Sequence, residues 1–259
     1  MRTVHRVLDP NAPCEIAARL CALAVMSKAP RAGEVKTRLV PPLTPDEAAR
    51  LNGAFLRDIS GAISSICRCG GLRPPQRSAH GVGVYTPPGA EAAYENVLPE
   101  DFFLIPQRGD NFGDRLNFAA EDLFKVGFNS VCLINSDSPT IPAEVFAQAV
   151  VLLGLRGDRI VLGPSDDGGY YLIGLKEPHR EVFERIDWST ERVFDQTLQR
   201  AAEIGVEVKL LPTGYDVDDR AALRRLCDEL LDETPRGGLA PNTRKFLTEI
   251  IEPEGRARI

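Results

Sequence analysis

The chain has 259 residues, of which 43% are hydrophobic and 26% are charged, and its formal net charge is -6. A chain of this length can bury one large core, so we expect one domain rather than two. The acidic balance argues against a protein that binds nucleic acid through its phosphates, because such domains are usually basic. No apolar run is long enough for a membrane span, and the stretch 20–26 lacks the cleavage site of a signal peptide.

Six cysteines are spread over the chain. This pattern is typical of reduced thiols rather than of a disulfide framework, and it predicts a cytoplasmic protein. Three histidines show no spacing that indicates a catalytic triad or a zinc site, so hydrolase and zinc-enzyme functions lack support.

Apolar runs alternate with amphipathic stretches in the order expected of an α/β sheet. We expect residues 1–20 to form an N-terminal extension and residues 21–250 to form the domain, which begins with a strand near 20–26. Thr44, Pro45 and Glu47 supply an N-cap, a first-turn proline and a capping box, which predicts a helix to about residue 66. Further strands are predicted at 81–85, 102–105, 131–134, 160–162, 170–175 and 206–211. Further helices are predicted after Gly113-Asp114 to about residue 125, from 142, at about 190–203 with Ser189 or Thr190 as N-cap, and from 219.

A basic loop follows the first predicted strand, and its candidate phosphate-binding residues are Lys28, Arg31, Gly33, Lys36 and Arg38. A solvated turn is the alternative for such a charge run. The position favours phosphate binding, because ligands of open α/β sheets collect at the carboxyl ends of strands. The chain has no G-x-G-x-x-G fingerprint, and the residue before its Lys-Thr pair is not the glycine that a Walker A loop requires, so a dehydrogenase and an ATPase are disfavoured.

Asp137 follows the run 131–134, which is apolar without alternation and therefore reads as a buried central strand. A carboxylate at the end of such a strand faces the ligand crevice, where it is a candidate ligand for Mg²⁺ or Mn²⁺. The alternative is that Asp137 caps the helix that follows. Asp218 supplies a second carboxylate if the sheet order brings the two strand ends together, with a surface cap again as the alternative.

Paired carboxylates and glycines precede the strand predicted at 170–175. Asp166 or Asp167 is a candidate to bind acceptor hydroxyls or to act as a general base. Gly168 and Gly169 let the backbone approach a ligand closely, although a plain turn is the alternative. Only one of the two tyrosines that follow can face that ligand, because successive strand residues point to opposite sides.

Four segments together carry a resemblance to a known family: 28–39 (KAPRAGEVKTRL), 136–139 (SDSP), 163–175 (GPSDDGGYYLIGL) and 188–190 (WST). From about residue 23 to 247 the chain resembles the DUF2064 family, glycosyltransferase-A-like proteins of the nucleotide-diphospho-sugar transferase superfamily. The resemblance implies an α/β fold with a mixed, mainly parallel central sheet and helices on both faces. It also implies a nucleotide held over the first strand's loop.

The same resemblance implies site residues. Asp137 matches the last acidic position of the superfamily's D-x-D-like metal motif, while Asn135 stands where many members carry the first aspartate. Asp218 lies in a segment that resembles the C-terminal D-x-D of related nucleotidyltransferases, where a second metal ligand is found. Independently of the resemblance, Gln107, Gly113 and Arg115 follow the third predicted strand and are candidates to hold the nucleotide. The candidates for the acceptor are Gly168, Gly169 and Tyr170.

Two enzyme functions use these parts. The first is metal-dependent glycosyl transfer from a nucleoside-diphosphate sugar to a small acceptor. The alternative is nucleotidyl transfer, in which a phosphorylated small molecule attacks a nucleoside triphosphate and pyrophosphate leaves. A third hypothesis is an inactive nucleotide-binding sensor. The expected partners are a nucleotide or nucleotide-sugar and a small acceptor, with no nucleic acid.

Overall fold

The computed structural model describes residues 5–12, 16, 20–68, 78–231 and 239–252. Within them, one seven-stranded sheet has the order β3-β2-β1-β4-β6-β5-β7. Strand β6 is antiparallel to both of its neighbours, and all other neighbouring pairs are parallel. The predicted mixed, mainly parallel sheet is therefore confirmed. The strands are β1 (Cys21–Lys28), β2 (Ala79–Thr86), β3 (Phe103–Pro106), β4 (Ser130–Ile134), β5 (Arg159–Pro164), β6 (Tyr170–Leu175) and β7 (Glu207–Leu210).

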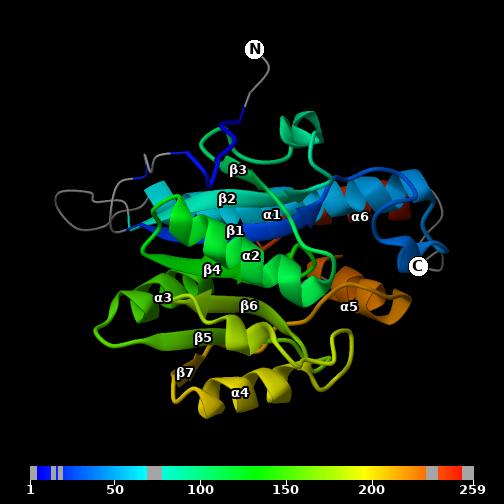
Figure 1. The fold of residues 1–259 in the computed structure, drawn as a ribbon. Coiled ribbons are helices and arrows are strands. Elements are labelled where there is room, and N and C mark those ends of the chain that lie inside the picture. Colours follow the sequence, from blue (N-terminus) through cyan, green and yellow to red (C-terminus); the bar gives the residue numbers. More distant parts are fainter. Residues whose placement is uncertain (1–4, 13–15, 17–19, 69–77, 232–238, 253–259) are drawn as a thin grey trace.

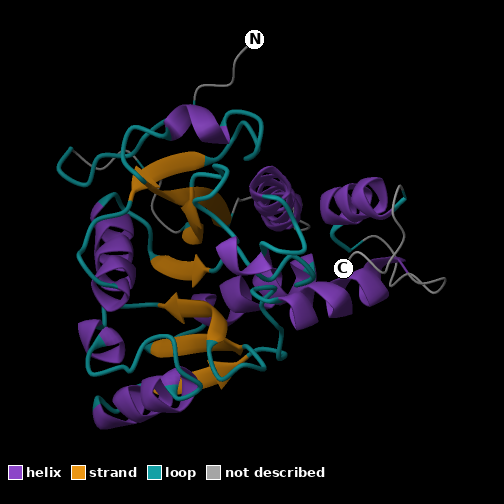
Figure 2. Cartoon of the chain, turned by 90° about the vertical axis from the view of Figure 1, so that its right-hand side faces the viewer, coloured by secondary structure: helices purple, strands orange, loops and turns teal. Residues whose placement is uncertain are grey.

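Helices cover both faces of this sheet (Figures 1 and 2). One apolar cluster joins α1 and α3 to the sheet, and a second joins α2 and α4 to its other face. A third cluster packs α5 and α6 against α1 as an outer layer. None of the described helices has the length and apolar character needed to cross a membrane. The helices are α1 (Pro45–Arg68), α2 (Phe112–Lys125), α3 (Ala143–Gly154), α4 (Val193–Glu203), α5 (Arg220–Leu231) and α6 (Pro241–Ile251), with the short 3-10 helices η1 (Thr37–Leu39), η2 (Glu91–Tyr94) and η3 (Arg180–Phe183).

The start of α1 follows from its first residues. The Thr44 backbone N–H donates to Glu47 Oε2 at 2.8 Å, and the Glu47 N–H donates to Thr44 Oγ1 at 3.3 Å. These reciprocal bonds satisfy helix N–H groups that would otherwise lack partners. The predicted capping box is confirmed, and it fixes the direction in which α1 leaves the basic loop.

Two helices differ from the sequence prediction. Helix α6 was not predicted. Helix α4 begins at Val193 with Arg192 at its N-cap, so the prediction of Ser189 or Thr190 was wrong. Ser189 has a left-handed backbone, φ 64°, so the chain turns there before the helix can start.

Part of the predicted N-terminal extension lies along β3, an edge strand of the sheet. The Leu104 N–H donates to the Arg6 carbonyl at 2.9 Å, and the Leu8 N–H donates to the Leu104 carbonyl at 2.7 Å. These bonds occupy one residue of an edge that would otherwise be open. The boundary between extension and domain stays a prediction.

Four of the six cysteines are described, and all four are buried thiols: Cys21, Cys67, Cys132 and Cys227. Cys14 and Cys69 lie outside the described residues.

Candidate functional site

Loops from distant parts of the sequence meet where β1, β4 and β5 end. The Val217 N–H donates to the Asp137 carbonyl at 2.9 Å, which joins the loop after β7 to the loop after β4. The Asp166 N–H donates to the Gly214 carbonyl at 3.1 Å, which joins the β5–β6 turn to the same loop. The sheet order therefore brings together three of the segments that the sequence singled out.

Lys36, from the basic loop, lies at the centre of this meeting point. Its Nζ lies 2.6 Å from Asp137 Oδ1 and 2.9 Å from Asp218 Oδ1, and it donates to the Val217 carbonyl at 2.8 Å. Only 4% of the Lys36 side chain is exposed, so three acceptors take up its three N–H donors away from bulk water. Burial disfavours the ammonium charge, but the two carboxylates outweigh burial and raise the pKa of Lys36 above its ordinary value.

The backbone of Lys36 is unusual for a residue with a side chain. Its φ of 50° is left-handed, a conformation that costs about 1 kcal/mol or more outside glycine. Val35 and Leu39 on either side are buried and anchor the loop against the protein. The three polar contacts of Lys36 offset the strain and hold its ammonium between the carboxylates.

Asp137 and Asp218 fit the donor set of a hard divalent cation. Both place a carboxylate oxygen against one nitrogen, so the two oxygens lie close enough to share a cation, and the Val217 carbonyl is a third oxygen at the same point. Among the described residues no three His, Cys, Asp or Glu side chains gather to hold a metal. An ion here would therefore complete its shell with water, carbonyl or phosphate oxygens, as Mg²⁺ commonly does. Asp137 does not cap the following helix, because the N-cap of α3 is Pro142 and makes no side-chain bond.

Asp216 is the first aspartate of the D-x-D-like segment 216–218, of which the sequence analysis gave a role to Asp218 alone. Its Oδ1 accepts from Asn135 Nδ2 at 2.8 Å, from Ser138 Oγ at 2.6 Å and from Ser165 Oγ at 3.4 Å. Burial raises the pKa of Asp216 to about 6, and the charge of Asp137 adds to this against the opposing bond from Ser138. Asn135, which stands where many members of the superfamily carry an aspartate, therefore donates to a partly buried carboxylate instead of supplying one.

The paired carboxylates of the β5–β6 turn have different surroundings. Asp166 forms an ion pair with Arg225 of α5, both largely exposed. The Oδ1 of Asp167 accepts from the Gly169 N–H at 3.0 Å, and Asp167 is exposed. Gly168 has φ 86°, and a Cβ there would lie 2.2 Å from the Glu191 carbonyl, so its close approach is to the chain itself. Both carboxylates are therefore exposed, and Asp166 is engaged by an arginine whereas Asp167 forms no ion pair among the described residues.

The two tyrosines that begin β6 point to opposite faces of the sheet, as expected. Tyr170 packs with the cluster under α2 and α4, and its hydroxyl oxygen is buried. Tyr171 packs with the other cluster, and its hydroxyl donates to the Pro212 carbonyl at 2.7 Å. Neither hydroxyl lies open at the edge of the sheet, so the predicted acceptor role of Tyr170 finds no support in its position.

The remaining cations of the basic loop are exposed. Lys28 pairs with Glu34 at 3.7 Å, and Gly33 between them turns with φ 76°. Arg31 and Arg38 form no ion pair with a carboxylate in the described part of the chain. These two side chains are therefore available to an anion, whereas Lys36 already holds carboxylates.

The three nucleotide candidates after β3 do not join this cluster through any described contact. Gln107 donates its amide to the Ser27 and Val84 carbonyls at 3.1 and 2.8 Å, which ties β1 to β2. A Cβ at Gly113 would lie 2.7 Å from Trp188 Nε1, so this glycine allows α2 to pack closely. Arg115 is exposed and donates to the Gly109 carbonyl at 3.4 Å.

Comparisons with known proteins agree with the fold. Residues 76–190 match the family model described as "Uncharacterized protein conserved in bacteria (DUF2064)". A solved structure from Desulfovibrio desulfuricans G20, assigned as a nucleotide-diphospho-sugar transferase, is 28% identical over 90% of this chain and 95% of its own, with a TM-score of 0.75. The structure of CMP:2-keto-3-deoxy-manno-octonic acid synthetase complexed with CTP is 10% identical over 84% of this chain and 100% of its own, with a TM-score of 0.52, and shares the fold alone. No curated protein matched. The resemblance to DUF2064 and the glycosyltransferase-A-like fold are confirmed.

Proposed function

We propose that this protein is a metal-dependent transferase that acts on a nucleotide-activated substrate, and that its reaction is glycosyl transfer from a nucleoside-diphosphate sugar to a small acceptor. The observation that carries the proposal is the convergence of Lys36, Asp137 and Asp218 at the carboxyl edge of the sheet. The likeness to the Desulfovibrio protein supports the same reaction class.

Asp137 and Asp218 would hold Mg²⁺ or Mn²⁺, which when bound supplies positive charge to a diphosphate leaving group. Arg31 and Arg38 are exposed on the same loop and would bind phosphate oxygens, since a guanidinium donates to them through two N–H groups. Asp167 is the carboxylate we assign to the acceptor hydroxyl, because Asp166 is engaged by Arg225.

Lys36 gives this site a particular property. Its ammonium contacts the carboxylate oxygens that we assign to the metal. The metal and the ammonium therefore compete for the same two side chains. Lys36 released from them would be a third cation for the phosphates.

Nucleotidyl transfer is the second candidate, and one observation favours it. Asp218 contacts the same Lys36 ammonium as Asp137 does. Asp218 also belongs to the segment that resembles the second metal-binding motif of related nucleotidyltransferases. Both reactions need the same phosphate and metal contacts and differ in the bond that breaks.

The products decide between these functions. The protein is incubated with Mg²⁺ or Mn²⁺ and a panel of nucleoside-diphosphate sugars with small acceptors, and separately with nucleoside triphosphates and phosphorylated small molecules. Release of nucleoside diphosphate supports glycosyl transfer, whereas pyrophosphate supports the second candidate. Bound nucleotide with neither product in any mixture would overturn both and identify a sensor.

A further inference from the structure

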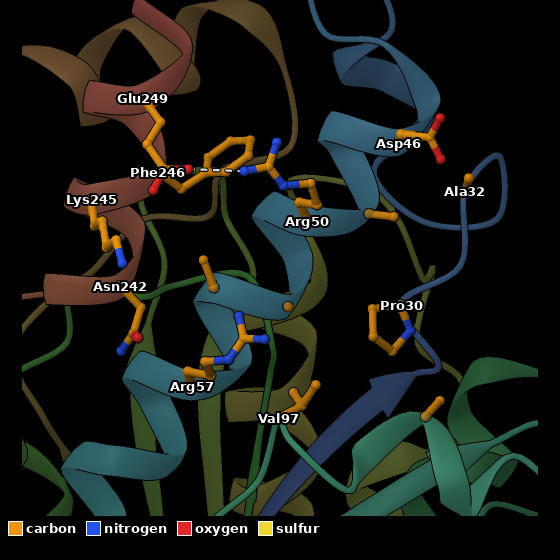
Figure 3. A pocket seen from close by; sticks show the side chains of 14 residues that line it. Pro30, Ala32, Asp46, Arg50, Arg57, Val97, Asn242, Lys245, Phe246 and Glu249 are labelled. Atoms are coloured by element: carbon orange, nitrogen blue, oxygen red, sulfur yellow. Dashed lines mark hydrogen bonds and ion pairs between the residues drawn. The ribbon is translucent and has the colours of Figure 1, made fainter.

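A groove lies between α1 and α6, and its lining residues include none of Lys36, Asp137 and Asp218 (Figure 3). It has a volume of about 700 Å³, which is within the range of small-molecule sites. Helix α1 separates the two places, since Phe55 on one side of the helix lies 5.3 Å from the Lys36 ammonium. Gly53 and Ala54 form part of the groove on the other side, and Pro30 and Ala32 of the basic loop close one end.

The spacing of residues along the two helices explains the hollow. Helix α1 contributes residues at intervals of three and four, and those in the floor are small: Ala49, Gly53 and Ala54. A surface helix with small residues in this stripe leaves space beside it. Helix α6 contributes Asn242 and Lys245 to the opposite wall.

A buried carboxylate fixes the two walls relative to each other. Asp58 of α1 is 7% exposed and accepts four hydrogen bonds from α6. The backbone and side-chain N–H groups of Asn242 donate to its Oδ1 at 2.9 and 2.8 Å, and the Thr243 N–H and hydroxyl donate to its Oδ2 at 2.8 and 2.6 Å. The groove is therefore preformed, which lowers the entropic cost of binding.

The cations of the groove are unequally paired. Arg50 is neutralised, since it contacts Glu249 at 2.9 Å and stacks over the Phe246 ring at 5.0 Å. Neither Arg57 nor Lys245 has a carboxylate partner in the described part of the chain. The Arg57 Nε donates to the Asn96 carbonyl at 3.1 Å, and its Nη1 lies 3.7 Å from the position of a Cβ at Gly53, so the guanidinium folds back over the floor.

We propose that this groove is a second binding site, specific for a small molecule that carries a phosphate group. Arg57 and Lys245 bind the phosphate, because a guanidinium and an ammonium on facing helices supply several charged donors. The small-residue floor accommodates a compact body attached to it. The charged lining residues are Asp46, Glu249, Arg50, Arg57 and Lys245, so cations exceed carboxylates in the groove. In a chain of net charge -6, this excess of positive charge in a fixed hollow favours an anionic ligand.

The test is an amide chemical-shift titration of the full chain with inorganic phosphate and with glycerol 3-phosphate, against chloride at equal ionic strength. We expect saturable shifts at Gly53, Ala54 and Asn242 with a phosphate probe and not with chloride. Tighter binding of glycerol 3-phosphate identifies a phosphate ester as the ligand, and equal binding identifies free phosphate.

Variants locate the site. The double variant Arg57→Gln, Lys245→Gln should weaken binding by about tenfold or more, since it removes two charged donors. The matched control Arg180→Gln, Lys125→Gln removes one exposed arginine and one exposed lysine elsewhere and should bind as the wild type does. Shifts confined to the basic loop, shifts that chloride reproduces, or equal affinity in a folded groove variant would overturn the proposal. The Lys36→Met variant should show the same chemical-shift changes in the groove as the wild type. A failure of the proposed transferase site can therefore be told apart from a failure of the groove.

Discussion

Replacing Lys36 by methionine should tighten the binding of Mn²⁺ to the nucleotide-free protein. A charge-assisted hydrogen bond contributes about 1.5–3 kcal/mol, and Lys36 makes two to carboxylates. The side chains of Asp137 and Asp218 are 29% and 48% exposed, so solvent screening keeps the total near the value for one such bond. An incoming ion must displace this interaction, and removing it should tighten the dissociation constant by about 10- to 100-fold.

Titration of Mn²⁺ by electron paramagnetic resonance measures this affinity directly, because only the free ion gives the sharp aqueous signal. The matched control is Lys28→Met, which removes a lysine of the same loop whose only ion pair among the described residues is with Glu34 at 3.7 Å. It should leave the affinity within about twofold of wild type. Unchanged or weaker Mn²⁺ binding in a folded Lys36→Met protein would refute the competition. It would mean that the ammonium arranges the carboxylates for the metal instead of occupying the place of the metal.

Three further predictions concern the same edge of the sheet. Asp137→Asn should abolish metal-dependent turnover while leaving the circular dichroism spectrum unchanged, and undiminished turnover would exclude Asp137 as a metal ligand. Asp167→Asn should lower kcat by about 10²- to 10⁴-fold if this carboxylate acts as general base. Asp166→Asn breaks an exposed ion pair with Arg225 and should cost under about 1 kcal/mol in stability. Equal kcat values for the two variants would contradict the assignment. The pKa of Asp216 is raised to about 6 in the folded protein, from a value near 3.8 in the unfolded chain. The protonated carboxyl therefore stabilises the fold fully below the unfolded pKa, and this contribution is lost as the pH rises through 6. In the metal-free protein, the free energy of unfolding relative to Asp216→Asn should fall by about 2–3 kcal/mol from pH 3.5 to 7 in urea titrations, and a pH-independent difference would show that burial does not perturb this carboxyl.

Local signals made much of the fold predictable. The Thr44 capping box set the start of α1, and the continuous apolar run at 131–134 identified β4 as a fully buried strand. Helix α6 was not predicted, although the sequence carries a helix signal there: Pro241 lies in its first turn, and the buried Phe246, Leu247 and Ile250 follow at helical spacing.

The site was less predictable because its chemistry depends on tertiary contacts. The basic loop and Asp137 could each be found from their positions after strands. That Lys36 pairs with two carboxylates instead of remaining free for phosphate depends on a left-handed backbone and on a loop 181 residues away in sequence. Asp216 acquires its role from Asn135, Ser138 and Ser165, which no local pattern connects to it.

The short bridge between residues 6–8 and Leu104 bears on how the protein behaves when its first residues are changed. Unpaired groups on an outermost strand can recruit a strand from another molecule. A chain shortened to start at β1 would uncover the backbone of Leu104, and a bulky tag close to Arg6 would disturb the same bonds. Self-association that grows with protein concentration is the expected consequence, and it would arise without any change at the carboxyl end of the sheet.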